Sequence, residues 1–243
     1  MMHKPKAIFS WSGGKDSSYA LYKVLQENTY EVMYLLTTVN QQVKRISMHG
    51  VRELLLQQQA ESIGIPLITL EIHEDSNAHY EQQMSEVLTR AKSEGINCVI
   101  FGDIFLENLR QYREDNMAKI HMKAVFPLWK RDTTELLTDF LTLGFKTITC
   151  CVNDGYLPEE WVGREIDEHF LKELPLNVDA CGENGEYHTF CYAGPLFKKR
   201  IAFTVGEKVY KPLVLNPSAT EAFPETNTKG FWFIDLLPAQ GLH

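Results

Sequence analysis

The amino-acid sequence predicts an α/β protein in which a five-stranded parallel sheet is followed by a second, smaller α+β domain. Five short apolar runs lie before residue 130, and segments with apolar residues at helical spacing separate them. Parallel strands give near-continuous apolar runs because helices bury both faces of the sheet. Beyond residue 130, apolar and polar residues alternate, as in strands with one wet face. We therefore expect two domains, over residues 1–130 and 131–243.

The elements of the first half follow one another in a regular order. The strands are expected at residues 7–11, 31–39, 66–72, 97–101 and 124–128. The helices are expected between them, at residues 18–27, 51–63, 80–91 and 107–119. Gly64 and Gly95 are suited to end the second and third helices, and Ser76 is suited to cap the third.

The second half begins with a capping box, Asp132 and Glu135, before an apolar helix that ends at Gly144. A short helix is expected at residues 164–174. Further strands are expected at residues 146–152, 201–205, 209–215 and 231–236. The aromatic run Phe231-Trp232-Phe233 fits either a core or an interface, which leaves a homodimer open.

The composition disfavours several classes of function, although a local basic patch would suffice to bind RNA. The chain has 243 residues and a net charge of −8, so it has no global basic field to attract nucleic acid or an anionic membrane. No apolar run approaches the roughly 20 residues that cross a bilayer. The five cysteines include no Cys-x-x-Cys pair, so neither a zinc site nor a redox pair is indicated. We expect a cytoplasmic protein with reduced thiols and without membrane or nucleic-acid partners.

The motif Ser12-Gly13-Gly14-Lys15-Asp16-Ser17 stands between the first strand and the first helix. A strand, a glycine turn and a helix direct backbone N–H groups and the positive end of a helix dipole at one point, which suits phosphate. Phe9 stands where a Walker loop has its first glycine, and the dinucleotide fingerprint is absent. The alternative is an ordinary turn in which Asp16 or Ser17 caps the helix.

Asp103 lies just beyond the fourth strand, after Gly102. In parallel sheets, ligands bind beyond the carboxyl ends of the strands, at the point where the strand order reverses. The crossover order can therefore bring Asp103 next to the glycine motif at the end of the first strand.

A second polar stretch, residues 179–189, combines two glycines, an amide, a histidine and several carboxylates. Side chains of these kinds can bind a metal, position an amine or transfer a proton. The alternative is a polar hairpin between two strands.

The SGGKDS motif, together with the late motif GENGEYHT (residues 182–189), resembles the diphthine–ammonia ligase family. That family is a PP-loop branch of the N-type ATP pyrophosphatases, which are adenine nucleotide alpha-hydrolase-like. Residues 47–50 and 101–104 are similar to the family as well. The resemblance implies a Rossmann-like nucleotide domain of the HUP type, followed by a smaller domain that carries the GENGE motif.

The resemblance also implies a reaction. Members of the family use ATP to adenylate the carboxylate of diphthine, a modified histidine of the translocating elongation factor; ammonia then displaces AMP and leaves an amide. We therefore expect ATP and Mg²⁺, a carboxylate acceptor and ammonia. The acceptor is a protein, the elongation factor, if diphthamide is made in the source organism.

The resemblance assigns residues to roles by matching the motifs. The residues expected to bind the nucleotide are Ser12, Gly13, Gly14, Lys15, Asp16, Ser17, Ser18, Thr37, His49, Gly102 and Asp103. Those expected to bind the acceptor or ammonium are Gly182, Glu183, Asn184, Gly185, Glu186, Tyr187, His188 and Thr189. Lys15, Glu183, Glu186 and His188 are the expected catalytic residues. Asp16 and Asp103 are the expected Mg²⁺ ligands.

Two other functions fit the phosphate motif. One is a PP-loop enzyme that modifies tRNA by sulfuration or lysine attachment; the acidic balance and the absence of Cys-x-x-Cys disfavour it. The other is a non-catalytic adenine-nucleotide sensor, which the second polar stretch disfavours because a sensor needs no second polar site.

Overall fold

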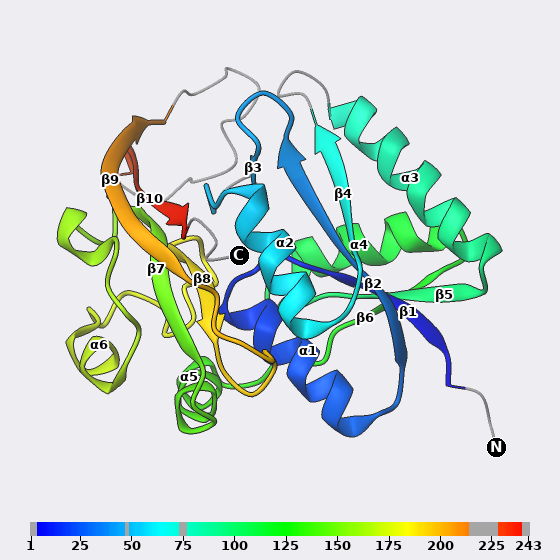
Figure 1. The fold of residues 1–243 in the computed structure, drawn as a ribbon, viewed down its shortest axis with the longest axis horizontal. Helices are drawn as coiled ribbons and strands as arrows, with labels where there is room; N and C mark the ends of the chain where they lie inside the picture. Colours follow the sequence, from blue (N-terminus) through cyan, green and yellow to red (C-terminus); the bar gives the residue numbers. More distant parts are fainter. Residues whose placement is uncertain (1–3, 47–48, 73–76, 214–227, 240–243) are drawn as a thin grey trace.

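The structure is a computed structural model that describes residues 4–46, 49–72, 77–213 and 228–239. Its first sheet contains five parallel strands in the order β4-β2-β1-β5-β6 (Figure 1). These strands are β1 (Lys6–Ser10), β2 (Glu31–Asn40), β4 (Leu67–Ile72), β5 (Ile96–Ile100) and β6 (Lys123–Val125). A two-residue strand, β3 (Arg45–Ile46), pairs antiparallel with the end of β2. The predicted five-stranded parallel sheet is confirmed.

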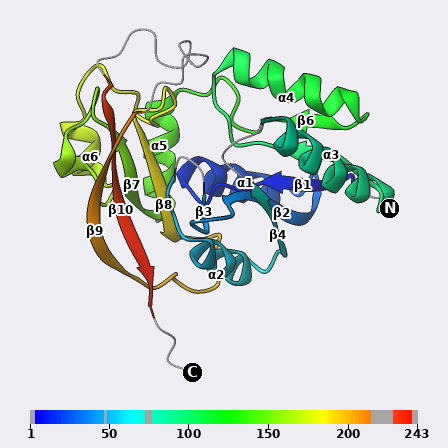
Figure 2. The ribbon, with the colours of Figure 1, turned by 90° about the horizontal axis from the view of Figure 1, so that it is seen from above.

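Helices cover both faces of this sheet, because its central strands are apolar on both sides (Figure 2). On β1, Ala7 and Phe9 belong to one buried cluster and Ile8 to the other. The first cluster includes α1 (Lys15–Glu27) and α2 (Glu53–Ile63); the second includes α3 (Asn77–Ser93) and α4 (Glu107–Lys119). The strand order reverses between β1 and β5, so a ligand crevice is expected at their carboxyl ends.

The second sheet is antiparallel and has the order β8-β7-β10-β9. Its strands are β7 (Lys146–Asn153), β8 (Tyr187–Ala193), β9 (Phe203–Pro212) and β10 (Gly230–Pro238). The same half contains α5 (Thr133–Thr142), the 3₁₀ helix η1 (Glu159–Trp161) and α6 (Glu168–Glu173). The predicted capping box is confirmed in part: the Asp132 side chain accepts a hydrogen bond from the Glu135 amide at 2.9 Å.

Three expectations about the second half need correction. The two strands predicted at residues 201–205 and 209–215 are one strand, β9, because Gly206 and its exposed neighbours continue an edge strand instead of turning. The helix predicted at residues 164–174 begins only at Glu168, because Asp167 caps it by accepting from the Phe170 amide at 2.8 Å. The polar stretch 179–189 is not a hairpin between two strands, because α6 precedes it and only its last residues, from Tyr187 on, enter a strand, β8. Residues 214–215 and Ser76 lie outside the described residues.

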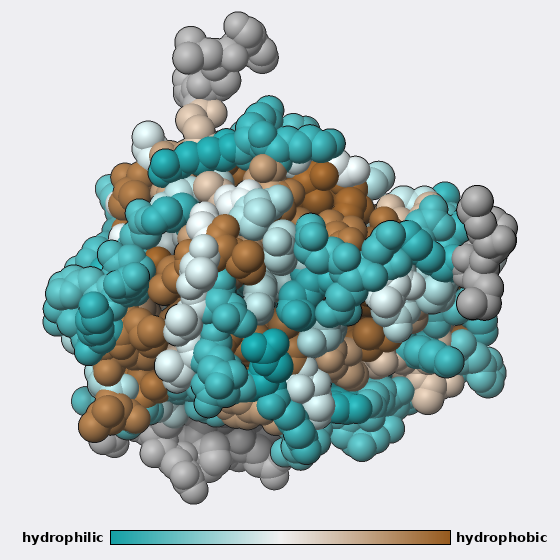
Figure 3. All heavy atoms as spheres, turned by 90° about the horizontal axis from the view of Figure 1, so that it is seen from below, coloured by the Kyte–Doolittle hydropathy of each residue, from teal (hydrophilic) through white to brown (hydrophobic). Residues whose placement is uncertain are grey.

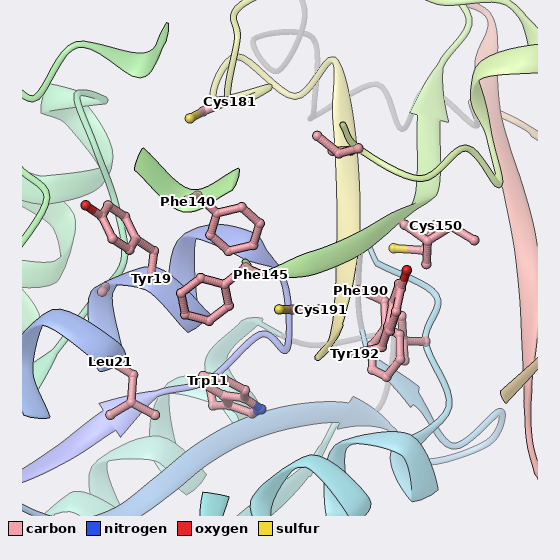
Figure 4. Close-up of a cluster of buried hydrophobic side chains, with 14 of the residues drawn as sticks. Trp11, Tyr19, Leu21, Phe140, Phe145, Cys150, Cys181, Phe190, Cys191 and Tyr192 are labelled. Atoms are coloured by element: carbon pink, nitrogen blue, oxygen red, sulfur yellow. The ribbon is translucent and has the colours of Figure 1, made fainter. Parts of the chain in front are cut away.

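One buried core runs through both halves (Figure 4). Trp11 and Tyr19 from the first half lie in it together with Phe140, Phe145 and Phe190 from the second. The division into domains at residue 130 stays a prediction. All five cysteines are buried free thiols. The sequence predicted the free thiols but not the burial of all five.

The surface in Figure 3 is largely hydrophilic, with apolar side chains in smaller patches between the charged ones. Within the described ranges, none of the helices has both the length and the apolar character to cross a bilayer.

Replacement of Phe140 by alanine tests the shared core. Its ring stacks on Phe145 at 4.6 Å between centres and meets Tyr19 edge-on at 6.4 Å. We expect Phe140→Ala to lower the free energy of unfolding by about 3–5 kcal/mol, because it leaves a cavity where both halves meet. Urea denaturation measures the loss. Leu176→Ala is the control, since Leu176 is fully exposed, and equal losses in the two variants would contradict the shared core.

Candidate functional site

The turn between β1 and α1 requires glycine. Gly13 has a φ of 76°, in the left-handed region where a side chain would be strained. Gly14 is the N-cap of α1, and no side chain caps the helix there. The alternative interpretation of this turn, with Asp16 or Ser17 as the N-cap, is therefore wrong.

The first amides of α1 have no acceptor within the helix, so they depend on partners outside it. The Lys15 amide donates to Thr189 Oγ1 of β8 at 2.9 Å. The Ser17 amide has no hydrogen-bond partner among the residues that the structure describes. Gly102 lies against it: a Cβ at Gly102 would come within 3.2 Å of the Ser17 nitrogen. A free amide at the positive end of a helix is suited to bind an anion.

The serine hydroxyls of the motif do not all face the same way. Ser12 Oγ donates to Ser17 Oγ at 3.0 Å, and Ser17 Oγ donates to the carbonyl oxygen of Gly14 at 3.0 Å. Ser18 is fully buried, with its hydroxyl beside the thiol of Cys191. Ser12 and Ser17 thus surround the turn, whereas the Ser18 hydroxyl faces β8.

Lys15 is only 3% exposed. Its ammonium group donates to both oxygens of Asp16, at 2.8 and 2.9 Å, and to the carbonyl oxygen of Cys181, and it lies 5.2 Å from the centre of the Tyr187 ring. Burial by itself lowers the pKa of Lys15, but Asp16, with Cys181 and Tyr187, outweighs burial and raises this pKa above its ordinary value. Burial raises the pKa of Asp16 despite the attraction of Lys15. Lys15 therefore keeps its charge at physiological pH.

Glu183 connects the polar loop of the second half to the end of β5. Its Oε1 accepts from the Ile104 amide at 2.7 Å and from the Phe105 amide at 3.4 Å. Burial, together with the charge of Asp16, raises the pKa of Glu183 to about 7, although the Ile104 amide opposes this shift. A carboxyl group that titrates near neutral pH can both accept and release a proton.

Glu186 is fully buried within its own loop. Its Oε1 accepts from the Asp179 amide at 2.9 Å and from the side-chain amide of Asn184 at 3.0 Å. Its Oε2 accepts from the backbone amide of Asn184 at 2.9 Å. Gly182 and Gly185 have φ values of 69° and 83°, which let the loop close around this carboxylate. Glu186 thus shapes the loop that carries Glu183.

The rings of His49 and His188 are in contact, with their centres 4.7 Å apart and their planes tilted by 34°. His49 Nδ1 lies 3.1 Å from the carbonyl oxygen of Thr189. Burial lowers the pKa of His49 to about 4, and burial together with His49 lowers the pKa of His188 well below its usual range. Both rings are therefore neutral at physiological pH and add no positive charge to a phosphate site.

The other residues predicted to bind the nucleotide either pair with a neighbouring side chain or are buried within a strand. Asp103 forms a two-pronged ion pair with Arg113 of α4, which engages both carboxylate oxygens. Thr37 is buried within β2, in register with Thr69 of β4. Residues 47–48 lie outside the described residues.

Gln59 and Arg113 also belong to this site, although no sequence motif includes them. Gln59, on α2, is completely buried and donates to the carbonyl oxygen of Gly13 at 2.9 Å. The burial of Gln59 could be predicted from the sequence, because at helical spacing it falls on the apolar face of α2 together with Leu55, Leu56 and Ile63. The ion pair of Arg113 could not be predicted from the sequence, because residues that pair across a loop have no fixed spacing.

A cavity of about 390 Å³ opens between α3, α4 and the first sheet. Ser10 and Phe101 line it; Ser10 lies two residues before the glycine motif, and Phe101 directly precedes Gly102. Its floor is apolar, with Leu36 and Val99 from the sheet. A cavity of this size and character is suited to a small organic ligand.

The chain is similar to proteins of one family over most of its length. The family model described as the diphthamide synthase N-terminal domain matches residues 5–124, and the one described as the diphthamide synthase C-terminal domain matches residues 132–214.

The similar curated proteins are named diphthine–ammonia ligase. The protein from Danio rerio is 31% identical over 62% of this chain and 65% of its own length, just under two thirds. Those from Rattus norvegicus and Homo sapiens are 28% and 26% identical over 82% of both chains. Among solved structures, the tRNA thiolase NcsA from Methanococcus maripaludis shares 15% identity over 59% of each chain, with a TM-score of 0.39, which is too weak to bear on fold or function.

The pH dependence of folding tests the position of Glu183. Its pKa is 4.5 ordinarily and about 7 in the folded chain. Between these two values the folded state binds more protons than the unfolded state, so this group makes the protein less stable as the pH rises from 4.5 to 7. We expect urea denaturation to show this decline in the wild type and not in Glu183→Gln. The exposed Glu168→Gln is the control, and parallel profiles of wild type and Glu183→Gln would contradict the assignment.

Proposed function

The chain belongs to the diphthamide synthase family, and from this premise we propose that it is an ATP-dependent ligase that forms an amide from a carboxylate and ammonia. We further propose that it acts as an N-type ATP pyrophosphatase, which releases AMP and pyrophosphate. The free Ser17 amide at the start of α1, beside the buried charge of Lys15, carries this proposal.

The phosphate end of the site matches the chemistry of adenylation. When a carboxylate attacks the α-phosphorus of ATP, pyrophosphate leaves and negative charge grows on both sides of the phosphorus. Prearranged donors in a site that excludes water stabilise such charge most effectively. The Ser17 amide, the Ser12 hydroxyl and the Lys15 ammonium are the donors that we assign to it.

The second polar loop is suited to the ammonia half of the reaction. Ammonia is mostly ammonium in neutral water and must lose a proton before it attacks the adenylate. We assign this proton to Glu183, because the pKa of its carboxyl group is about 7 and the charges of Asp16 and Lys15 act on it. Glu186 positions the loop through its three hydrogen bonds, and we do not assign it a proton transfer.

Mg²⁺ belongs to the same proposal. Negative charge accumulates at this edge of the sheet, since Asp16 and Asp103 both help to raise the pKa of Glu183, and a cation would relieve it. The described ranges contain no cluster of three His, Cys, Asp or Glu side chains that could hold a metal. Mg²⁺ usually binds to one or two carboxylates together with substrate phosphates, so such a cluster is not required. Asp16 and Asp103 are the candidate ligands; each now pairs with a cation, Asp16 with Lys15 and Asp103 with Arg113. Bound Mg²⁺ would neutralise charge on phosphate oxygens.

We propose that the cavity between α3 and α4 receives the nucleoside of ATP. It opens next to the glycine motif through Ser10, and its apolar floor suits a flat base. This moves the expected base position from Thr37, which is buried in β2, to the neighbouring Leu36.

The curated relatives are named for diphthine and ammonia. We propose a carboxylate acceptor of this kind for the present chain, and the elongation factor as the acceptor protein where diphthamide is made. A cytoplasmic location and a homodimer stay predictions.

The cysteines weigh against the sulfur-transferring alternative. A persulfide enzyme needs a cysteine that ionises readily. Here burial raises the pKa of Cys98 to about 11 and of Cys191 to about 12, and it also raises those of Cys150, Cys151 and Cys181.

Substitution of Lys15 tests the proposed reaction. With ATP, ammonium and an elongation factor that carries diphthine, we expect the wild type to form AMP and pyrophosphate, and Lys15→Ala to lose at least about a hundredfold in rate because a donor to the developing charge is gone. Chromatography of the nucleotides measures both products. Lys23→Ala, on the same helix, is the matched control. Formation of ADP and phosphate by the wild type would overturn the proposal.

A further inference from the structure

Gln59 is a completely buried amide that connects three separate segments. Its Oε1 accepts from the indole Nε1 of Trp11 at 3.0 Å. Its Nε2 donates to the carbonyl oxygen of Gly13 at 2.9 Å and to that of Cys191 at 2.6 Å. A buried side-chain amide is costly unless its donors and acceptor are paired, and here both N–H groups and the oxygen have partners.

The orientation of this amide is determined by its neighbours. Trp11 offers only a donor, and the Gly13 and Cys191 carbonyls offer only acceptors. A flipped amide would set an N–H group against the indole N–H and an oxygen against two carbonyl oxygens. Figure 4 shows Trp11 and Cys191 on neighbouring parts of the same core.

The carbonyl oxygen of Gly13 is held by two donors. Besides Gln59 Nε2, the backbone amide of Cys191 donates to it at 2.8 Å. The described peptide bonds are all trans, so the N–H of Gly14 points away from the Gly13 oxygen. Fixing that oxygen inward therefore directs the Gly14 amide outward, where it has only a long contact of 3.3 Å with Ser12 Oγ.

The glycine and the glutamine fit one another closely. A Cβ at Gly13 would come within 2.7 Å of Gln59 Oε1. The close approach of the amide to the turn thus needs both the absence of a side chain and the left-handed φ of Gly13.

We propose that Gln59 is the positioning residue of the phosphate loop: by holding the Gly13 carbonyl inward, it directs the Gly14 amide at the diphosphate end of the substrate. The inference rests on the proposed function, because it needs an anion at this loop. Gln59 acts through Gly13 and touches no reacting atom.

Calorimetric titration with inorganic pyrophosphate tests the proposal on the full chain. Gln59→Leu keeps a side chain of similar size and removes all three hydrogen bonds. We expect its affinity for pyrophosphate to fall about tenfold, which is about 1.4 kcal/mol. In ¹⁵N-labelled protein, pyrophosphate should shift the Gly14 amide resonance of the wild type and not that of Gln59→Leu.

Thr147→Val is the matched control for lost stability. Thr147 is also fully buried, and its hydroxyl donates to the carbonyl oxygen of Phe190 on β8 at 2.9 Å, without touching the loop. We expect this variant to unfold at a lower temperature and to bind pyrophosphate as the wild type does. If Gln59→Leu fails to fold, Trp11→Phe removes only the donor to Gln59 Oε1 and should weaken binding about threefold.

The results separate the inference from the proposed function. Equal pyrophosphate affinity in Gln59→Leu and wild type, or an equal loss in Thr147→Val and Gln59→Leu, would overturn the role of Gln59. A wild type that binds no pyrophosphate would overturn the proposed function itself.

Discussion

The structure depends on the backbone contact between the glycine turn and β8. The Cys191 amide donates to the Gly13 oxygen, and Thr189 accepts from the Lys15 amide. Residues nearly 180 positions apart in the chain therefore meet at the turn itself. A Cβ on Gly14 would come within 3.0 Å of the Thr189 backbone oxygen, so a side chain there would push the turn and β8 apart. The contact that joins the two halves therefore also fixes the shape of the anion site.

Buried charge follows from this junction. Closing β8 over the turn removes Lys15 from water, and burial of an ammonium group is costly without a partner. Asp16 and the Cys181 carbonyl oxygen supply partners for Lys15. Burial, with the charge of Asp16 beside it, raises the pKa of Glu183 to about 7. Perturbed groups of this kind gather at functional sites. The same burial that holds the halves together thus prepares both the charge and the proton acceptor of the proposed reaction.

Sequence patterns predicted the parallel sheet and the glycine turn because both have local signals: apolar runs for strands, and a missing Cβ at Gly13. They did not reveal that Glu186 faces its own loop, since the direction of a carboxylate depends on the left-handed Gly182 and Gly185 around it. The sequence patterns also did not predict contacts between residues that are far apart in the chain. The spacing places Gln59 as a polar residue on an apolar helix face, but it does not predict the three hydrogen-bond partners of its side chain.

The most direct measurement is a crystal structure with an ATP analogue whose α–β bridge resists cleavage, soaked together with Mg²⁺. We expect phosphate oxygens within hydrogen-bond distance of the Ser17 amide and the Lys15 ammonium, with the base between α3 and α4. A structure in which the analogue binds elsewhere, while the turn and its Ser17 amide stay covered by protein, would contradict the account.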